Sequence, residues 1–307
     1  MMQSNLTSAI RPRFATVLLA AAALLSAAPL RAQLQPQKPS LTPPQQNAPP
    51  SSAPAAPAPE QAPTSTPAPA PPPAPPATPE TLAKGEAIVL AAAKAAGGNS
   101  LKSVKSVEIH VSGQANTPNG PMDLSLKLII VFPDRLRNDA ELPVGTVTQG
   151  FDGKSGWVQT RQGLIDLPEE FLAEFSRGIA LTGGWGLYQQ ALDGKIEAQY
   201  IDDEDFDGKK TSVVQWSTGS GPVRLYFDSA THLLVGAHFR TITPQGDVQA
   251  DQHWSDFRAV EGNQFPFRNR VDHDGQKFTE TTVSEVKINV NPDPAIFTRP
   301  AEEKPSS

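Results

Sequence analysis

The 307-residue chain contains no cysteine, so no disulfide supports its fold and no cysteine is present to be acylated as in a bacterial lipoprotein. Beyond residue 32 no apolar run approaches the roughly 20 residues that a membrane-spanning helix needs. Basic clusters are also missing. The net charge is −6, and because residues 1–79 hold four basic residues and one acid, residues 80–307 carry −9. An acidic domain of this kind excludes binding to nucleic-acid phosphates and docking on anionic lipid surfaces.

Motifs of catalysis are missing as well. The chain has no nucleophile elbow, no phosphate-binding glycine loop and no dinucleotide fingerprint. Its five histidines, at positions 110, 232, 238, 253 and 273, have no spacing typical of metal ligands. We therefore expect no catalytic residue, no metal, no cofactor and no enzymatic activity.

One acidic stretch matches half of a calcium loop. Asp203, Asp205 and Asp207 occupy its first, third and fifth positions, and Gly208 occupies the sixth. The twelfth position, where a bidentate glutamate is needed, is Val214. We interpret this stretch as the solvated tip of a β-hairpin.

The N-terminal segment, residues 1–32, predicts a secretory signal peptide. Arg11 and Arg13 precede an apolar run over residues 15–30, and Leu30-Arg31-Ala32 offers a cleavage site. A permanent membrane anchor is the alternative, disfavoured because the run is short. The predicted location is the bacterial periplasm, with no transmembrane span in the mature chain.

Residues 33–79 predict a disordered linker. They hold more than half of the 32 prolines, have no aromatic residue, and are mostly Pro, Ala, Gln, Ser and Thr, so they cannot form a core. In a polyproline II conformation, at roughly 3.1 Å per residue, such a segment reaches on the order of 140 Å. The segment is either a spacer that extends the reach of the folded domain or a low-complexity leader that is merely tolerated.

Residues 80–299 predict a single β-rich domain, followed by a tail at 300–307. Thr78-Pro79-Glu80 begins a helix that ends before Gly97. After Leu101, alternating apolar and polar residues are interrupted by Gly, Asp and Pro turns about every ten residues. The candidate strands are 103–113, 122–132, 135–141, 144–151, 155–160, 195–202, 210–217, 222–228, 232–241, 247–256, 265–273 and 276–289.

A helical insertion interrupts these strands. A helix opens after Leu167 and carries Phe171 and Phe175, and Gly183-Gly184 precedes a second helical stretch from Trp185 to Leu192. The predicted fold is mainly β with α: a strongly curved antiparallel sheet of about 11 strands, an unclosed barrel, with helices on its concave face.

Period-two alternation places one set of apolar residues on the face beneath the helices. We predict that this face binds an apolar ligand and that Phe171, Phe175 and Trp185 form a lid over it. A filled core is the alternative, because periodicity alone does not distinguish a cavity from a packed interior. The candidate binding residues are Leu124, Leu126, Leu128, Ile130, Phe132, Leu225, Phe227, Leu233, Val235 and Phe239.

Several segments resemble the LolA and LolB type of periplasmic lipoprotein carriers and receptors. The similar stretches are Leu126 to Arg137, which runs through Phe132-Pro133, then Phe151-Asp152-Gly153-Lys154 before Trp157, Leu225 to Asp228, Leu233 to Val235, and Asp293 to Phe297. The resemblance covers residues 80–299. It implies an unclosed barrel with helices as a lid over an apolar cavity. The carrier has an arginine before this proline, thought to hold the lid, where this chain has Phe132.

The resulting hypothesis is a carrier or chaperone for lipoproteins or another acylated ligand in the cell envelope. Its expected partners are an acylated lipoprotein or lipid and proteins of the inner or outer membrane. The alternative is a non-catalytic module that senses lipid or serves as a protein-interaction scaffold. A hydrolase of envelope lipids or glycans is a third interpretation, which would need a Ser, His and Asp group in one cleft.

Overall fold

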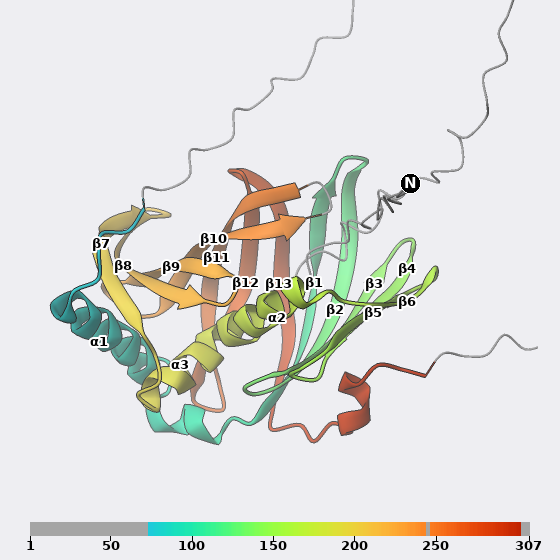
Figure 1. Cartoon of the computed structure of the whole chain (residues 1–307), viewed down its shortest axis with the longest axis horizontal. Coiled ribbons are helices and arrows are strands. Elements are labelled where there is room, and N and C mark those ends of the chain that lie inside the picture. Colours follow the sequence, from blue (N-terminus) through green and yellow to red (C-terminus); the bar gives the residue numbers. More distant parts are fainter. Residues whose placement is uncertain (1–72, 244–245, 302–307) are drawn as a thin grey trace, which may run out of the picture.

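The fold was obtained as a computed structural model, which describes residues 73–243 and 246–301. The predicted signal peptide at 1–32, most of the predicted linker and most of the predicted tail lie outside the described residues. The described part of the chain forms one antiparallel sheet of 13 strands, which is not closed, and three α-helices (Figure 1). The mainly β class with helices is confirmed.

The helices and strands follow the predicted segments closely. The helices are α1 (Pro79–Ala95), α2 (Glu169–Leu181) and α3 (Trp185–Leu192), with short 3₁₀ turns η2 (Gly98–Ser103), η3 (Thr182–Gly184) and η4 (Pro294–Phe297). The strands are β1 (Ser106–Thr117), β2 (Gly120–Val131), β3 (Arg135–Leu142), β4 (Gly145–Phe151), β5 (Gly156–Thr160), β6 (Gly163–Asp166), β7 (Ala198–Phe206), β8 (Lys209–Thr218), β9 (Gly221–Asp228), β10 (Leu234–Thr243), β11 (Gly246–Val260), β12 (Asn263–His273) and β13 (Gln276–Ile288).

The predicted count of about 11 strands was wrong, since the sheet has 13. No candidate segment covered β6, because its four residues are too few to show a period of two. It forms by pairing with β5 across a turn at Gly163, where φ is 135°. The first candidate strand also began too early, because Gly98–Ser103 is a 3₁₀ turn.

The order of the strands places the helices. Strands β1 and β13 pair in the middle of the sheet, which runs from β6 at one edge to β7 at the other. These two edge strands are consecutive in the chain and are joined by α2 and α3. The helical insertion therefore has to cross from one free edge to the other, and Figure 1 shows it running in front of the sheet.

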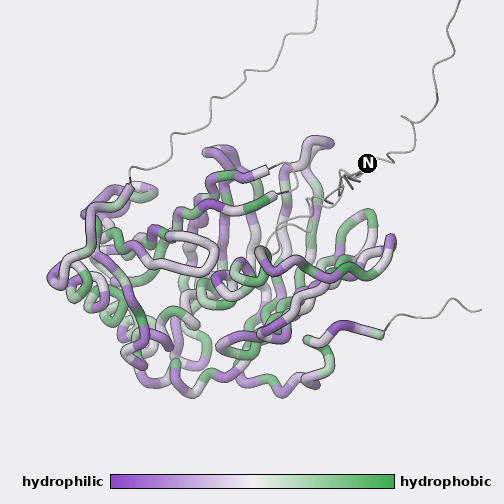
Figure 2. Tube along the Cα trace, viewed as in Figure 1, coloured by the Kyte–Doolittle hydropathy of each residue, from purple (hydrophilic) through white to green (hydrophobic). Residues whose placement is uncertain are grey.

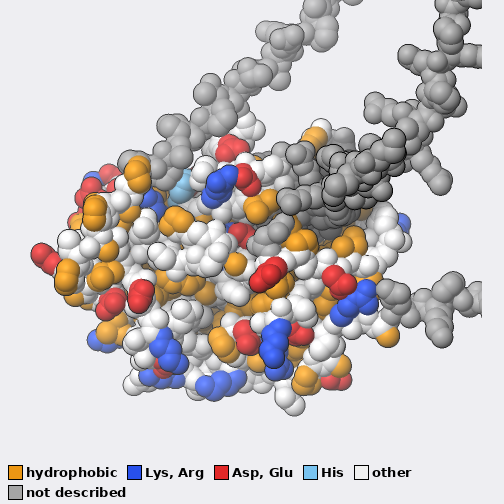
Figure 3. Space-filling model, in the orientation of Figure 1, with side chains coloured by type: hydrophobic (Ala, Val, Ile, Leu, Met, Phe, Trp, Pro, Cys, Tyr) orange, Lys and Arg blue, Asp and Glu red, His pale blue; other side chains and the backbone are white. Residues whose placement is uncertain are grey.

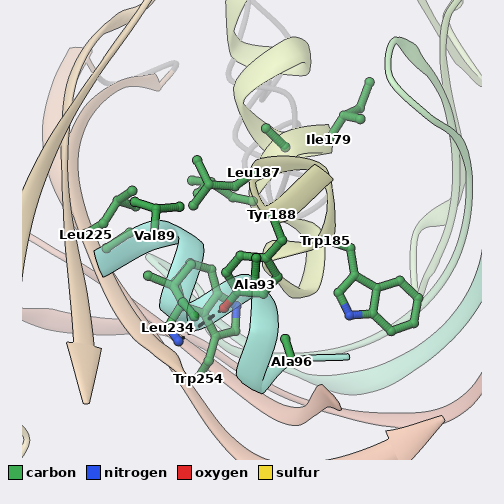
Figure 4. Packing of buried hydrophobic residues seen from close by; sticks show 14 of the residues in the cluster. Val89, Ala93, Ala96, Ile179, Trp185, Leu187, Tyr188, Leu225, Leu234 and Trp254 are labelled. Atoms are coloured by element: carbon green, nitrogen blue, oxygen red, sulfur yellow. Dashed lines mark hydrogen bonds between the residues drawn. The ribbon is translucent and has the colours of Figure 1, made fainter. Parts of the chain in front are cut away.

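Alternation of polar and apolar residues along the strands (Figure 2) gives the sheet its buried face. Side chains from all three helices and from strands β1–β4 and β7–β13 form the main core cluster. Figure 4 shows Val89 and Ala93 of α1 close to Leu187 and Tyr188 of α3. The Tyr188 hydroxyl accepts a hydrogen bond from the backbone N–H of Leu234, at 3.2 Å.

Helix α1 begins where the sequence predicted. The Thr78 side chain accepts a hydrogen bond from the N–H of Thr81, whose hydroxyl in turn accepts the N–H of Thr78. Along its length α1 lies directly against β7. A Cβ placed on Gly85 would stand 2.2 Å from the carbonyl oxygen of Ala198, so only glycine permits this approach.

We expect Gly85→Ala to lower the free energy of unfolding by about 1–3 kcal/mol, because the added methyl group displaces α1 from β7. In a helix free of such contacts the same change stabilises by about 1 kcal/mol. Urea denaturation measures the change in the free energy of unfolding, and the sign of this change distinguishes the two cases. An unchanged or raised stability would show that α1 and β7 are not in close contact.

Candidate functional site

A cavity of about 510 Å³ lies between helix α2 and the sheet. Strands β1, β2 and β10–β13 form its wall, and α2 with η3 forms its roof. Its volume falls in the range of small-molecule sites. Its larger apolar side chains are Ile109, Val111, Leu126, Leu128, Leu181, Phe239, Val248, Ala250, Trp254, Phe265, Val271, Phe278 and Val283.

Strand register builds the apolar wall. Val283, Val111 and Leu126 are directly paired across β13, β1 and β2. In a neighbouring part of the wall, Phe239 and Ala250 are paired across β10 and β11. Because paired residues of antiparallel strands point to the same face, these residues form a continuous apolar surface.

Helix α2 contributes a charged pair to the cavity. Glu174, Arg177, Gly178 and Leu181 line it, at a spacing that places them on one side of a helix. Glu174 and Arg177 are only 6% and 5% exposed and form an ion pair through Oε2 and Nη2. Thr241 of β10 donates a hydrogen bond to the same Glu174 oxygen at 3.0 Å.

Burial controls the electrostatics of this pair. Desolvation raises the pKa of Glu174 above its ordinary value, although the Arg177 charge and the hydrogen bond from Thr241 oppose the shift. Burial lowers the pKa of Arg177, and Glu174 opposes that shift. An arginine side chain stays protonated in proteins. The pair therefore places two opposite charges in the wall of an otherwise apolar cavity.

The rim of the cavity is polar. It includes Asn116 near the end of β1, Asn119 in the turn that follows, and His273 at the end of β12. The His273 ring stacks on Phe278, with ring centroids 4.1 Å apart. Burial lowers the pKa of His273 below its ordinary value, while Asp274 and Asp272 oppose that shift. At neutral pH this imidazole is therefore uncharged.

The predicted binding residues divide between several environments. Leu126, Leu128 and Phe239 line the cavity. Leu124 packs in a separate cluster on β1–β5 with Ala140 and Val158. Five further predicted residues belong to the main core or pack against it, and they do not line the cavity. These are Ile130, Phe132, Leu225, Phe227 and Leu233.

Val235 lies on the opposite face of the sheet, in a cluster with Val213 and Tyr226. The prediction that Leu233, Val235 and Phe239 share one face was wrong for Val235, because β10 has a bulge. The pairing of β9 with β10 shifts between Leu234 and Gly236, and this extra residue reverses the alternation.

The three predicted lid residues are core residues of the helical layer. Phe175 stacks on Phe151 of β4 at 5.3 Å, and the indole N–H of Trp185 donates to the carbonyl of Gln264 at 2.8 Å. Phe171 is also buried in the main core. None of these three residues lines the cavity. Sequence reasoning missed Glu174 and Arg177, which are identifiable as a charged i, i+3 pair amid the apolar residues of one helix.

The acidic stretch at 203–208 forms the β7–β8 hairpin, as predicted. Its carboxylates have protein partners: Asp203 accepts from Ser212 at 2.8 Å, and Asp205 accepts from Lys210 at 2.7 Å. Asp207 contacts His253 Nδ1 at 2.7 Å on the outer face of the sheet. No group of three or more candidate metal ligands occurs within residues 73–243 and 246–301.

No protein-family model and no curated protein matches the chain. The chain is similar in structure to LolA superfamily proteins. Such a protein from Nitrosomonas europaea is 15% identical, with 70% of this chain and 97% of that chain covered and a TM-score of 0.47.

Two further solved structures are similar. A putative outer membrane lipoprotein-sorting protein domain from Vibrio parahaemolyticus is 11% identical, with 70% of this chain and 97% of that chain covered and a TM-score of 0.46. A DUF1329 family protein from Desulfovibrio piger is 11% identical, with 71% and 97% covered and a TM-score of 0.48.

Proposed function

We propose that this protein is a non-enzymatic carrier that binds an acyl chain in the cavity beneath α2. The supporting observation is a volume of about 510 Å³ whose lining surface is mainly apolar. Each methylene group that leaves water for such a surface contributes about 0.8 kcal/mol to binding. A packed interior has no comparable space, since few voids larger than a water molecule occur in protein cores.

We also propose where the protein acts and how its helices are placed. The helices cover the concave face of the sheet, and the acylated ligand, a lipoprotein or another lipid, is carried within a bacterial envelope. The signal-like residues 1–32 support export. No helix in the described ranges is long and apolar enough to cross a membrane. Lysine, arginine and acidic side chains are intermixed on the face shown in Figure 3, with no large basic patch.

We expect Ala250→Phe to weaken binding of the neutral fluorescent probe N-phenyl-1-naphthylamine by roughly tenfold or more, because the new ring occupies the cavity. Ala250 is buried on β11 and lines the cavity. Fluorescence titration measures the affinity, and circular dichroism verifies that the sheet is retained.

The matched control is Ala259→Phe, which makes the same change at an exposed position of the same strand. It should bind the probe as the wild type does. Equal affinities of the two variants would contradict binding in this cavity. A wild-type protein that binds no probe and releases no lipid on extraction would instead favour a protein-interaction scaffold.

A further inference from the structure

Few ionisable side chains border the cavity. Among the described residues that line it, these are Glu174, Arg177 and His273. Glu174 and Arg177 neutralise each other, and burial keeps the His273 imidazole uncharged at neutral pH. The lining described here thus offers no uncompensated positive charge to a ligand.

The two terminal nitrogens of the Arg177 guanidinium are hydrogen-bonded by the protein. Nη1 donates to the Ser220 hydroxyl at 2.9 Å and to the Arg240 carbonyl at 3.3 Å. Nη2 donates to Glu174 and to the Thr241 hydroxyl, the latter at 3.5 Å. Each terminal nitrogen carries two N–H groups, so all four have acceptors. The Phe239 ring covers the guanidinium, with its centroid 4.1 Å from Cζ.

Glu174 makes the cavity unfavourable for anions. Its Oε2 atom holds both Arg177 and Thr241 in place. An anionic group that entered from water would lose its hydration, find no free N–H on the terminal nitrogens of Arg177, and approach a carboxylate. Desolvating a charge without a partner costs several kcal/mol, whereas an ester or amide loses much less.

We propose that the cavity accepts acyl chains attached through uncharged ester or amide groups and rejects free fatty-acid anions, with Glu174 as the residue that sets this specificity. The inference rests on the proposed acyl-binding function and names its ligand class. Glu174 acts by neutralising Arg177 and by accepting a hydrogen bond from one of its terminal nitrogens. If the ligand carries a charged group, that group stays in solvent outside the rim of the cavity.

The test compares two ligands with the same chain, 1-monolauroylglycerol and laurate, as competitors that displace N-phenyl-1-naphthylamine. At about pH 8 laurate is an anion and His273 is neutral. We expect the wild-type protein to bind the monoester on the order of tenfold more tightly than laurate. Equal binding, or tighter binding of laurate, would overturn the inference.

Glu174→Gln should abolish this preference. Glutamine retains an oxygen that can accept from Arg177 but removes the negative charge, so laurate would supply the missing counter-charge. We expect laurate affinity to rise roughly tenfold while monoester affinity changes little. The control Glu141→Gln removes an acid from an exposed position of β3 and should bind as the wild type does.

The double variant Glu174→Gln, Arg177→Met separates specificity from stability. It removes both charges, and replacing a buried ion pair by neutral groups is often tolerated. It should fold and retain the wild-type preference for the monoester. A double variant that prefers laurate would overturn the role of the pair. If neither ligand displaces the probe from any variant, the acyl-binding function fails, and this inference fails with it.

Discussion

Trp185→Ala is expected to lower the free energy of unfolding by about 3–5 kcal/mol, among the largest effects of a single truncation in this chain. Trp185 is fully buried at the start of α3. Its ring meets Phe265 of β12 edge-on, with centroids 5.0 Å apart. Its indole N–H donates to the Gln264 carbonyl. The substitution therefore leaves a large cavity and an unsatisfied carbonyl where the helical insertion meets the sheet.

The graded control is Trp185→Phe, which retains an aromatic ring and loses only the N–H donor and part of the volume. Urea denaturation should place it between the wild type and Trp185→Ala. A loss below about 1 kcal/mol for Trp185→Ala would mean that the insertion is only loosely attached to β12. That outcome would favour the sequence-based prediction of Trp185 as a mobile lid residue.

Most of the sheet could be predicted because its strands have polar and apolar faces. In β2 apolar and polar residues alternate from Met122 to Lys127, so the position and the buried side of this strand follow from a period of two. Bulges are different. The bulge at Val235 lies beside Gly236, and an isolated glycine within a strand is a local signal for a bulge that the prediction of strict alternation did not use.

The cavity itself could not be predicted, because an apolar strand face looks the same whether another side chain or empty space lies against it. Leu126 and Ile130 are on the same side of β2, yet Leu126 lines the cavity and Ile130 is fully packed. The difference arises from where α2 crosses the sheet. Likewise, Glu174 and Arg177 are separated from Thr241 by more than 60 residues, so their network becomes visible only in three dimensions.

We expect Arg177→Met to destabilise the protein by about 3–5 kcal/mol at neutral pH, because it leaves Glu174 buried without a counter-charge. Methionine fills a similar volume, so little of the loss comes from packing. Phe239 and Thr241 lose the cation that contacts them. Equilibrium urea denaturation of the full chain gives the difference from the wild type.

The pH dependence of Arg177→Met identifies the cause of its instability. Burial already raises the pKa of Glu174 in the wild-type protein, and loss of the Arg177 charge raises it further. The folded state then holds its proton more tightly than the unfolded state does, so stability falls as pH rises from the ordinary glutamate value through the raised value. The deficit of Arg177→Met should therefore shrink as pH falls toward about 4.5.

The double variant with Glu174→Gln has no buried charge, and its deficit should be small and independent of pH. A deficit of Arg177→Met that stays constant from about pH 4.5 to about pH 8 would instead indicate lost packing, and the buried charge would not be its source.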